Sequence, residues 1–358
     1  MGRPAPPTPR PDGVALHDAC DLAAYRAAVL TEPRELDRRA LARLLARRWG
    51  LSNVRLEYLP VGFGSHHWKA VDARGTERFV TADDLEAAFQ TGGGADATFD
   101  ALDRAYRTAA ALRDEGLEFV VAPLADEAGG VLRRLDRRYA LSVLPFVEGE
   151  ASSFGPYESA EERRGMGHLL GRLHAATARI ERGLPRTADL ALPSRAVLEE
   201  ALRELDRPWR SGPLAEPARR LLTGAADAVT RRLEQYDALV EEVLDSSGAW
   251  VLTHGEPHRA NVVRGRDGAV HLVDWDTTLI APRERDLTMV LDDELTGWDE
   301  YRAAAGAREL DERAMDLFRR WWELADICVF VAEFRRPHER TKEISVAWES
   351  LNGYLSKT

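Results

Sequence analysis

The stretch that decides the fold is VLTHGEPHRANVVRGRDGAVHLVDWDTTLIAPRERDL, residues 251–287. It places an acid, Glu256, in a loop and an amide, Asn261, five residues later, and two apolar strands joined by an Asp-Gly turn then lead to Asp274. The hairpin is predicted to return Asp274 to the edge at which Asn261 lies. Phosphoryl transfer from ATP needs a carboxylate that orients the acceptor hydroxyl and oxygen ligands for Mg²⁺, and this pattern meets both needs.

The segment resembles the aminoglycoside phosphotransferase family, whose usual loop is H-G-D-x-x-x-x-N followed by I-D-W or I-D-F. Its continuation at 276–287, DTTLIAPRERDL, is most similar to the spectinomycin phosphotransferase branch. The order of features along most of the chain is also similar: a glycine turn, three strands, a helix, a hinge and a helical lobe. The resemblance implies an α+β, two-lobed protein-kinase-like fold, with a small antiparallel sheet and one inserted helix in the N-lobe and a larger, mostly helical C-lobe.

The resemblance also implies an activity, the transfer of a phosphoryl group from ATP, with Mg²⁺, to a hydroxyl group of a small molecule such as an aminoglycoside-like antibiotic or another metabolite. Matched by position, Asn261 and Asp274 would be the Mg²⁺ ligands, and Glu256 would occupy the position of the catalytic base. His254 would brace the loop, and Asp286 would be the buried acid that pins the loop from the next helix.

The nucleotide is expected to bind under a glycine turn, VGFGSHH at 61–67, and against a hinge, PFVEG at 145–149. The resemblance implies that Pro145 offers its carbonyl, and Val147 its N–H and carbonyl, to adenine; proline suits the first position because only its carbonyl is needed. The glycine pair alone could equally form a simple hairpin turn. The expected nucleotide-binding residues are Gly62, Gly64, Ser65, Thr81, Pro145 and Val147.

Two positions depart from the family pattern. Glu256 stands where the family has aspartate; it keeps the carboxylate but adds one methylene, and a misplacement of about 1 Å can cost on the order of 100-fold in rate. Thr81 stands where a third-strand lysine would pair with the α- and β-phosphates, so a positive charge is missing. Lys69 on the neighbouring strand, or Arg104 or Arg107 on the inserted helix, could replace it, or Mg²⁺ and the glycine-turn N–H groups could suffice alone.

Three acids are candidates for recognising a cationic acceptor: Asp276, Asp292 and Asp293. The run Asp-Asp-Glu at 292–294 could equally be a solvated face, which is the commoner role of a charge run. Asp276 could serve the metal side or the acceptor side, or it could cap the next turn. The acceptor itself is not identified by the sequence.

The remaining elements are predicted from hydrophobic periodicity and turn residues. Helices are predicted at 21–30, 35–49, 97–115, 160–180, 195–205, 217–244 and 309–335. Strands are predicted at 54–59, 68–72, 78–82, 119–123, 131–135 and 139–144. Beyond the hinge the chain is predicted to be helical except for a strand-turn-strand at 261–275. The predicted domains are a disordered arm at 1–20, an N-lobe at 21–145 and a C-lobe at 146–358.

Composition limits the classes of partner. The net charge of −11 on 358 residues disfavours nucleic acid and is compatible with a cationic small molecule, although acidity can simply keep a protein soluble. No apolar run is long enough to cross a bilayer, and the N-terminus lacks the apolar core of a signal peptide. Cys20 and Cys328 are too few for a disulfide scaffold or a multi-cysteine zinc site, which favours a cytoplasmic protein.

Two alternatives to an active kinase stay open. Thr81 and Glu256 would also suit a catalytically impaired, pseudokinase-like ligand-binding protein, although the retention of both metal ligands argues against it. The same changes could accompany a flipped nucleotide and nucleotidyl transfer, because a fold alone does not decide the chemistry.

Overall fold

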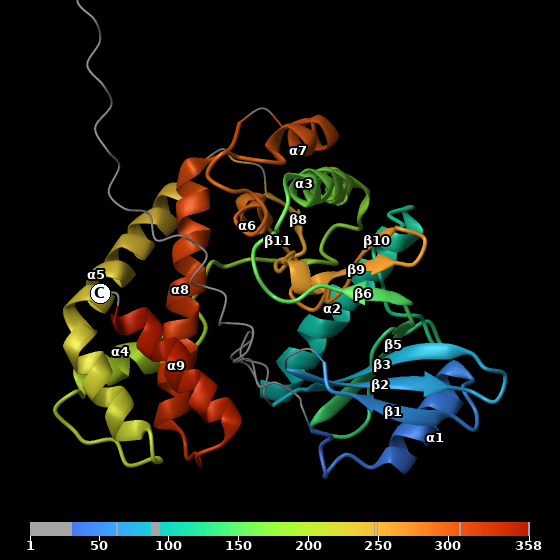
Figure 1. Ribbon diagram of the computed structural model, residues 1–358, viewed down its shortest axis with the longest axis horizontal. Helices are drawn as coiled ribbons and strands as arrows, with labels where there is room; N and C mark the ends of the chain where they lie inside the picture. Colours follow the sequence, from blue (N-terminus) through green and yellow to red (C-terminus); the bar gives the residue numbers. More distant parts are fainter. Residues whose placement is uncertain are drawn as a thin grey trace, which may run out of the picture.

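The structure, a computed structural model, describes residues 31–61, 64–86, 94–246, 248, 250–307 and 309–356. Figure 1 shows that they form two lobes, a smaller one built on a sheet and a larger one dominated by helices. The α+β, two-lobed architecture expected from the sequence, with a small antiparallel sheet in one lobe and a mostly helical second lobe, is confirmed. The arm expected at 1–20, the helix expected at 21–30 and Gly62 lie outside the described residues.

Within this part of the chain, five antiparallel strands form the N-lobe sheet in the order β1-β2-β3-β5-β4. Their bounds are β1 Arg55–Leu59, β2 Ser65–Val71, β3 Glu77–Asp84, β4 Arg133–Arg134 and β5 Tyr139–Pro145. Successive side chains of a strand point to opposite faces. The register aligns Trp68, Val80 and Val143 in one apolar row, which is fully buried with residues of helix α1 (Arg38–Trp49). The other face is turned toward the C-lobe (Figure 1).

Helix α2 (Gly94–Asp114) lies on this second face and joins the two lobes. Leu102 and Tyr106 pack with Ala140 of the sheet. One and two turns later, Ala109 and Leu112 belong to a core cluster that is otherwise built from C-lobe residues. Apolar residues at helical spacing along α2 therefore bury one stripe against both lobes, which fixes the floor of the cleft between them.

The C-lobe combines two helical packing units. Its helices are α3 Ala160–Ala175, α4 Arg195–Arg203, α5 Ala215–Leu244, α6 Glu284–Leu287, α7 Trp298–Ala305, α8 Glu312–Arg335 and α9 Lys342–Ser356. Helices α4, α5, α8 and α9 share one core, whereas α3 and α7 pack with the strands that carry the 254–274 segment. None of the described helices is both long enough and apolar enough to cross a membrane.

Two small sheets carry the segment quoted first. Their strands are β6 Gly149–Ala151, β7 Arg186–Thr187, β8 Trp250–Thr253, β9 Val262–Gly265, β10 Val270–Leu272 and β11 Leu279–Pro282. The order in one sheet is β10-β9-β6 and in the other β7-β11-β8. Because β6 pairs with β9, the hinge is hydrogen-bonded directly to the hairpin that leads to Asp274.

The structure corrects several predicted elements. The strand predicted at 119–123 is wrong: only an isolated bridge joins Val120 to Leu272, and the segment is apolar because it is buried against the C-lobe hairpin. The strand predicted at 131–135 shrinks to the two residues of β4. The prediction also missed α7 and α9, as well as β6, β7, β8 and β11, so the part beyond the hinge is less uniformly helical than expected.

Candidate active site

The buried carboxylate of Asp286 holds the start of the loop at 254–261 in place. Asp286 of α6 accepts hydrogen bonds from the backbone N–H groups of His254, at 2.8 Å, and Gly255, at 2.7 Å, and lies 3.0 Å from Nε2 of His174. His174 contacts the hydroxyl of Tyr301 through Nδ1 at 2.8 Å. Burial alone would raise the pKa of Asp286, but the hydrogen bond from His174 and nearby positive charge lower it. The loop is thereby tied to α3, α6 and α7.

His254 uses both ring nitrogens within this region. Nε2 donates to the carbonyl of Val273 at 2.9 Å, and Nδ1 accepts from the N–H of Glu256 at 3.1 Å, a pattern that assigns the proton to Nε2. The ring is fully buried and packs edge-on against Trp275. Burial lowers the pKa of His254 to about 4, so the ring is neutral at pH 7. It links the start of the loop to the end of the hairpin.

Glu256 and Asn261 lie in the same loop, and both side chains are largely buried. Nδ2 of Asn261 donates to the backbone carbonyl of Glu256 at 2.9 Å. Since the amide nitrogen donates inside the loop, the side-chain oxygen is the atom of Asn261 that could act as a metal ligand. The Glu256 carboxylate lies 3.7 Å from Nε2 of His258. The loop therefore offers an acid and an amide oxygen together.

Asp274 reaches the same place through the hairpin of β9 and β10. Val262 pairs with Leu272, and the N–H of Val273 donates to the carbonyl of Asn261 at 2.9 Å. The φ of Asp274 is 68°, a left-handed conformation that costs a non-glycine residue on the order of 1 kcal/mol or more. Such strain is concentrated at functional sites, and here it marks the acid that was expected to bind metal.

Asn261 and Asp274 fit a Mg²⁺ site that a nucleotide would complete. They supply an amide oxygen and a carboxylate, and Mg²⁺ usually combines one or two carboxylates with substrate phosphates and water. No cluster of three or more His, Cys, Asp or Glu side chains suited to a metal ion occurs among the residues that the structure describes. The donor set therefore suits a metal ion that arrives with phosphate ligands, rather than one caged by protein alone.

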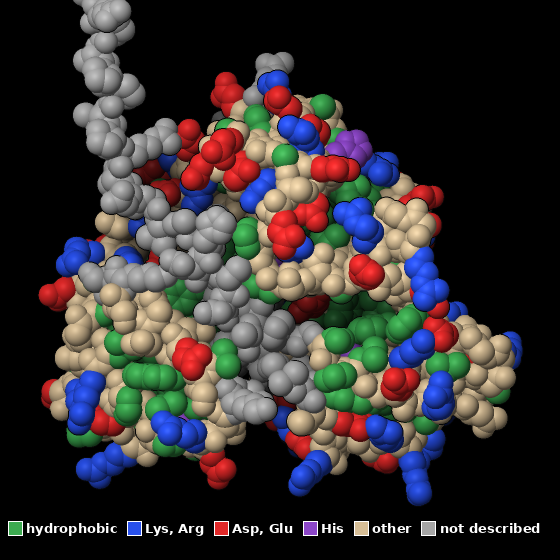
Figure 2. All heavy atoms as spheres, viewed as in Figure 1, with side chains coloured by type: hydrophobic (Ala, Val, Ile, Leu, Met, Phe, Trp, Pro, Cys, Tyr) green, Lys and Arg blue, Asp and Glu red, His purple; other side chains and the backbone are tan. Residues whose placement is uncertain are grey.

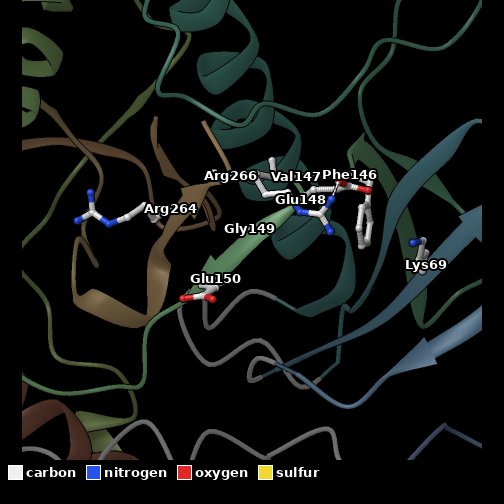
Figure 3. Close-up of a pocket in the computed structure, with 9 residues that line it drawn as sticks. Lys69, Phe146, Val147, Glu148, Gly149, Glu150, Arg264 and Arg266 are labelled. Atoms are coloured by element: carbon white, nitrogen blue, oxygen red, sulfur yellow. Dashed lines mark ion pairs between the residues drawn. The ribbon is translucent and has the colours of Figure 1, made fainter. Parts of the chain in front are cut away.

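A cavity of about 530 Å³ opens at the hinge. Figure 3 shows Phe146, Val147 and Glu148 on the hinge side and Lys69 of β2 across from them. The turn of the hairpin closes a further side, where a Cβ on Gly149 would lie 2.4 Å from a carbonyl oxygen of β9. Glycine is thus needed for the close approach of hinge and hairpin. Pro145 ends β5 and is exposed, and it does not line the cavity.

The hinge cavity and the loop face one cleft. Figure 2 shows a hollow between the two lobes that is lined by hydrophobic side chains, with an acidic side chain visible inside it. Strand β9 connects the two ends: Asn261 directly precedes it, and Arg264 and Gly265 reach the cavity. Three residues of strand span about 10 Å, so a nucleotide with its base in the cavity can extend its phosphates toward Asn261.

Thr81 lies in a neutral row on the inner face of the sheet. The register places it between His67 of β2 and Ser142 of β5, and Nδ1 of His67 lies 3.2 Å from its hydroxyl. Desolvation lowers the pKa of His67, so the ring carries no charge at pH 7. The hydroxyl of Ser142 is buried without a hydrogen-bond partner in the described part of the chain. The place of the expected lysine therefore holds no positive charge.

The basic residues considered as replacements point elsewhere. Lys69 pairs with Glu77 at 2.7 Å, and its Nζ lies 4.3 Å from the ring centre of Phe146, at the hinge end of the cleft. Arg104 is exposed and donates to a backbone carbonyl of the C-lobe at 3.3 Å. Arg107 is exposed and pairs with an acid one turn earlier on α2 at 3.4 Å. These contacts direct all three side chains to groups other than Thr81.

Asp83 is a residue of this region that the sequence analysis missed. It lies two residues after Thr81, on the same face of β3, and accepts a hydrogen bond from the hydroxyl of Ser65 at 2.7 Å. Both of its oxygens lie 3.2 Å from the hydroxyl of Tyr106. Burial raises the pKa of Asp83 to about 7 against the effect of the Ser65 hydrogen bond, and the charge of Asp276 adds to the rise. The two-residue period of the strand was the signal that could have found it.

The three acids expected on the acceptor side are in different settings. Asp276 is half-buried, and its charge contributes to the raised pKa of Asp83. Asp292 accepts from the N–H of Thr296 at 2.8 Å and pairs with Arg163 of α3 at 3.2 Å. Asp293 is exposed in the same segment. The contacts of Asp292 hold the chain before α7 against α3, and its expected role in substrate recognition stays a prediction.

Comparison with known families gives one match. A family model described as the phosphotransferase enzyme family, APH, matches residues 72–321. This range is more than half of the chain and contains Thr81, the hinge, the loop and Asp274. No sequence among curated proteins matches the chain.

Several solved structures have the same fold. Spectinomycin phosphotransferase, APH(9)-Ia, in complex with ADP and spectinomycin is similar with a TM-score of 0.69 and 14% identity, over 90% of this chain and 98% of that chain. Amicoumacin kinase hAmiN in complex with AMP-PNP, Ca²⁺ and Ami gives 0.56 and 14%, over 90% and 94%. The microcompartment-associated aminopropanol kinase gives 0.56 and 16%, over 89% and 95%. At these identities the likeness shows the fold alone.

Proposed function

Because the chain belongs to the phosphotransferase enzyme family and is a small-molecule phosphotransferase, we propose that it transfers the γ-phosphoryl group of ATP, with Mg²⁺, to a hydroxyl group of its acceptor. One observation carries this proposal. The acid Glu256, the amide oxygen of Asn261 and the carboxylate of Asp274 are gathered by one loop and one hairpin, at the end of the cleft opposite the hinge cavity.

In this proposal the adenine ring occupies the hinge cavity. Val147 lines this cavity, and its backbone N–H and carbonyl make no hydrogen bond to the described residues, so both are open to a base. Pro145 lies outside the cavity lining, so its expected carbonyl contact would need the base to extend beyond the cavity. The phosphates extend along β9 toward the glycine turn, where Gly64 and Ser65 are the expected nucleotide-binding residues that the structure describes. Thr81 offers them a hydroxyl at most.

The reaction needs few actors from the protein. Glu256 would accept the proton of the acceptor hydroxyl as its oxygen bonds to the γ-phosphorus, while the bond to the β,γ-bridging oxygen breaks and ADP leaves. Bound Mg²⁺ would neutralise charge on the phosphates, and Asn261 and Asp274 would hold it. His254 and Asp286 keep the loop in place through the hydrogen bonds described above. Glu256 is one methylene longer than the aspartate of the family pattern. The backbone of the loop would compensate for this length and set the position of the Glu256 carboxylate.

The acceptor class is proposed on chemical grounds. The net charge of −11 and the acids Asp276 and Asp293 favour a hydroxylated, cationic compound, and an aminoglycoside-like antibiotic belongs to this class. The proposal therefore includes a role in antibiotic resistance and a cytoplasmic location, where ATP and Mg²⁺ are at hand.

The test is calorimetric binding of ATP with and without Mg²⁺ to the wild type, to Asp274→Ala and to Asp299→Ala. Asp299 is an exposed acid of α7 and is a matched control. We expect Mg²⁺-dependent binding that Asp274→Ala abolishes and Asp299→Ala leaves unchanged. A wild type that binds no nucleotide at millimolar ATP would overturn the proposal in favour of a pseudokinase-like ligand-binding protein.

Nucleotidyl transfer is the second candidate, and the uncharged row around Thr81 is the observation that favours it. In this second candidate the nucleotide binds in the direction opposite to the one proposed above. Its α-phosphorus, rather than its γ-phosphorus, then lies at the loop. Mass spectrometry of the acceptor after incubation with ATP separates the two reactions, because an added phosphate and an added adenylate differ unmistakably in mass.

A further inference from the structure

We propose that Asp83 is a positioning residue, which clamps Ser65, at the end of the glycine turn, and helix α2 to strand β3 so that Gly64 and Ser65 are held beside the nucleotide phosphates. The inference rests on the proposed nucleotide site and assigns to it a residue outside the family pattern. Three elements from different parts of the chain meet at this one carboxyl group.

The geometry of the clamp is simple. Ser65 is the first residue of β2 and follows Gly64 directly, so its hydroxyl is the side-chain donor nearest to the end of the glycine turn. That hydroxyl donates to Oδ1 of Asp83 at 2.7 Å. From the other side, the hydroxyl of Tyr106, halfway along α2, donates to the same carboxyl group at 3.2 Å. Asp83 and Tyr106 are 5% and 6% exposed, so water competes little for these bonds.

A structural core has no need of this carboxyl group. Burying an acid costs free energy, because the carboxyl group loses its hydration. An apolar side chain of similar size at position 83 would lie beside its neighbours Ala140 and Tyr106 without that cost. Apolar packing is not directional, whereas two hydrogen bonds to one carboxyl group fix the positions of both donors. The buried carboxyl group therefore fixes the positions of Ser65 and Tyr106 and lowers the stability of the fold.

The clamp connects strand β3 to helix α2, a connection that Thr81 cannot make. The resemblance implies a lysine at position 81 that pairs with the α- and β-phosphates. Here a link from strand to helix is made one side chain further along the same face of β3, with the acid on the strand and the donor on the helix. It supplies the mechanical connection without the positive charge. The charges of Asp274 and Asp276 also raise the pKa of Tyr106.

The first test is a double-mutant cycle on Mg²⁺–ATP affinity with Ser65→Ala and Tyr106→Phe, in the wild-type and Asp83→Ala backgrounds. Ser65 and Tyr106 are linked through Asp83, so either change alone should release the turn. We expect each to weaken affinity about 5-fold, the typical effect of one lost hydrogen bond, and the pair together to be no worse than about 5-fold. In the Asp83→Ala background neither should have a further effect. Effects that multiply to about 25-fold, or that persist without Asp83, would overturn the clamp.

The second test uses no nucleotide. Amide exchange at Ser65, His66 and His67 should become about 5-fold faster in Ser65→Ala, Tyr106→Phe and Asp83→Ala alike. Tyr354→Phe is the matched control, because it removes a tyrosine–aspartate hydrogen bond of 3.0 Å to Asp326, between α8 and α9 of the C-lobe. It should change neither exchange nor affinity. Unchanged exchange in Tyr106→Phe would refute the clamp.

The two readouts separate the two proposals. If the wild type binds no nucleotide, the proposed kinase function falls, and the exchange rates still decide whether Asp83 clamps the turn. If nucleotide binds but the cycle is additive, only the clamp falls. A general loss of stability would lower the concentration of folded enzyme and therefore Vmax, and would leave both KM values unchanged, whereas loss of the clamp should raise KM for the nucleotide alone.

Discussion

Replacing Asp83 with asparagine should change how the stability of the protein depends on pH. In the folded protein the pKa of Asp83 is raised to about 7 by burial, and in the unfolded chain an aspartate has a pKa of about 3.9. The folded state therefore holds a proton that the unfolded state releases, so wild-type stability is lost as pH rises from about 4 through 7. About three pKa units correspond to roughly 4 kcal/mol in full, of which about 2.5 kcal/mol falls between pH 5 and pH 8.

The assay is urea unfolding of the wild type and Asp83→Asn at pH 5, 6, 7 and 8 without Mg²⁺, followed by circular dichroism and tryptophan fluorescence. Asparagine can still accept from Ser65 and meet Tyr106, so the variant removes the titration while keeping the contacts. The stability advantage of Asp83→Asn should grow by about 2.5 kcal/mol over this range. Asp126→Asn is the control: its partner Arg133 lowers the pKa of Asp126, so its difference from the wild type should stay constant. A constant difference for Asp83→Asn would refute the reasoning.

Three further changes probe the loop. Gly255→Ala should destabilise the protein by more than about 2 kcal/mol in urea, because φ is 103° and the new Cβ would lie 2.4 Å from Nη2 of Arg285; wild-type stability would contradict this. Asp286→Asn should cost about 2 kcal/mol and lower kcat, since two backbone N–H groups and His174 lose a charged acceptor, and unchanged thermal unfolding would speak against it. Glu256→Gln should lower kcat at least about 100-fold and leave the Kd of Mg²⁺–ATP within about 2-fold; a preserved kcat would remove Glu256 from the chemistry.

The loop and its hairpin could be predicted because their constraints are local. An Asp-Gly turn between two apolar strands fixes the register, and the register brings Asp274 beside Asn261 whatever the rest of the molecule does. The helix at 38–49 was predictable for the same reason, since Asp37 caps its start and Gly50, with φ of 65°, ends it. Charge, spacing and turn residues within some twenty positions sufficed in both cases.

The missed elements depend on partners that are distant in sequence. Residues 119–123 look like a strand because they are apolar, but what buries them is Leu272, about 150 positions away, and an isolated bridge replaces a ladder. Helix α7 has only eight residues, too few for a clear period, and it is stabilised where glycines allow it to approach α3. A Cβ on Gly167 of α3 would lie 2.2 Å from the carbonyl oxygen of Gly297. The sequence shows those glycines but not that they face each other.

The same distinction explains why the missing lysine was noticed and its surroundings were not. Thr81 departs from a pattern tied to one position, so the sequence exposes it. Asp83, Ser65 and Tyr106 come together only through the register of β2 with β3 and the packing of α2, and each alone is an unremarkable residue. If the clamp holds the turn, Thr81 in place of the lysine of the family pattern leaves the site without that positive charge but with the turn still in position. Nucleotide affinity should then depend more steeply on Mg²⁺ than on any single side chain of the N-lobe, because the cation would carry the neutralisation that the strand no longer supplies.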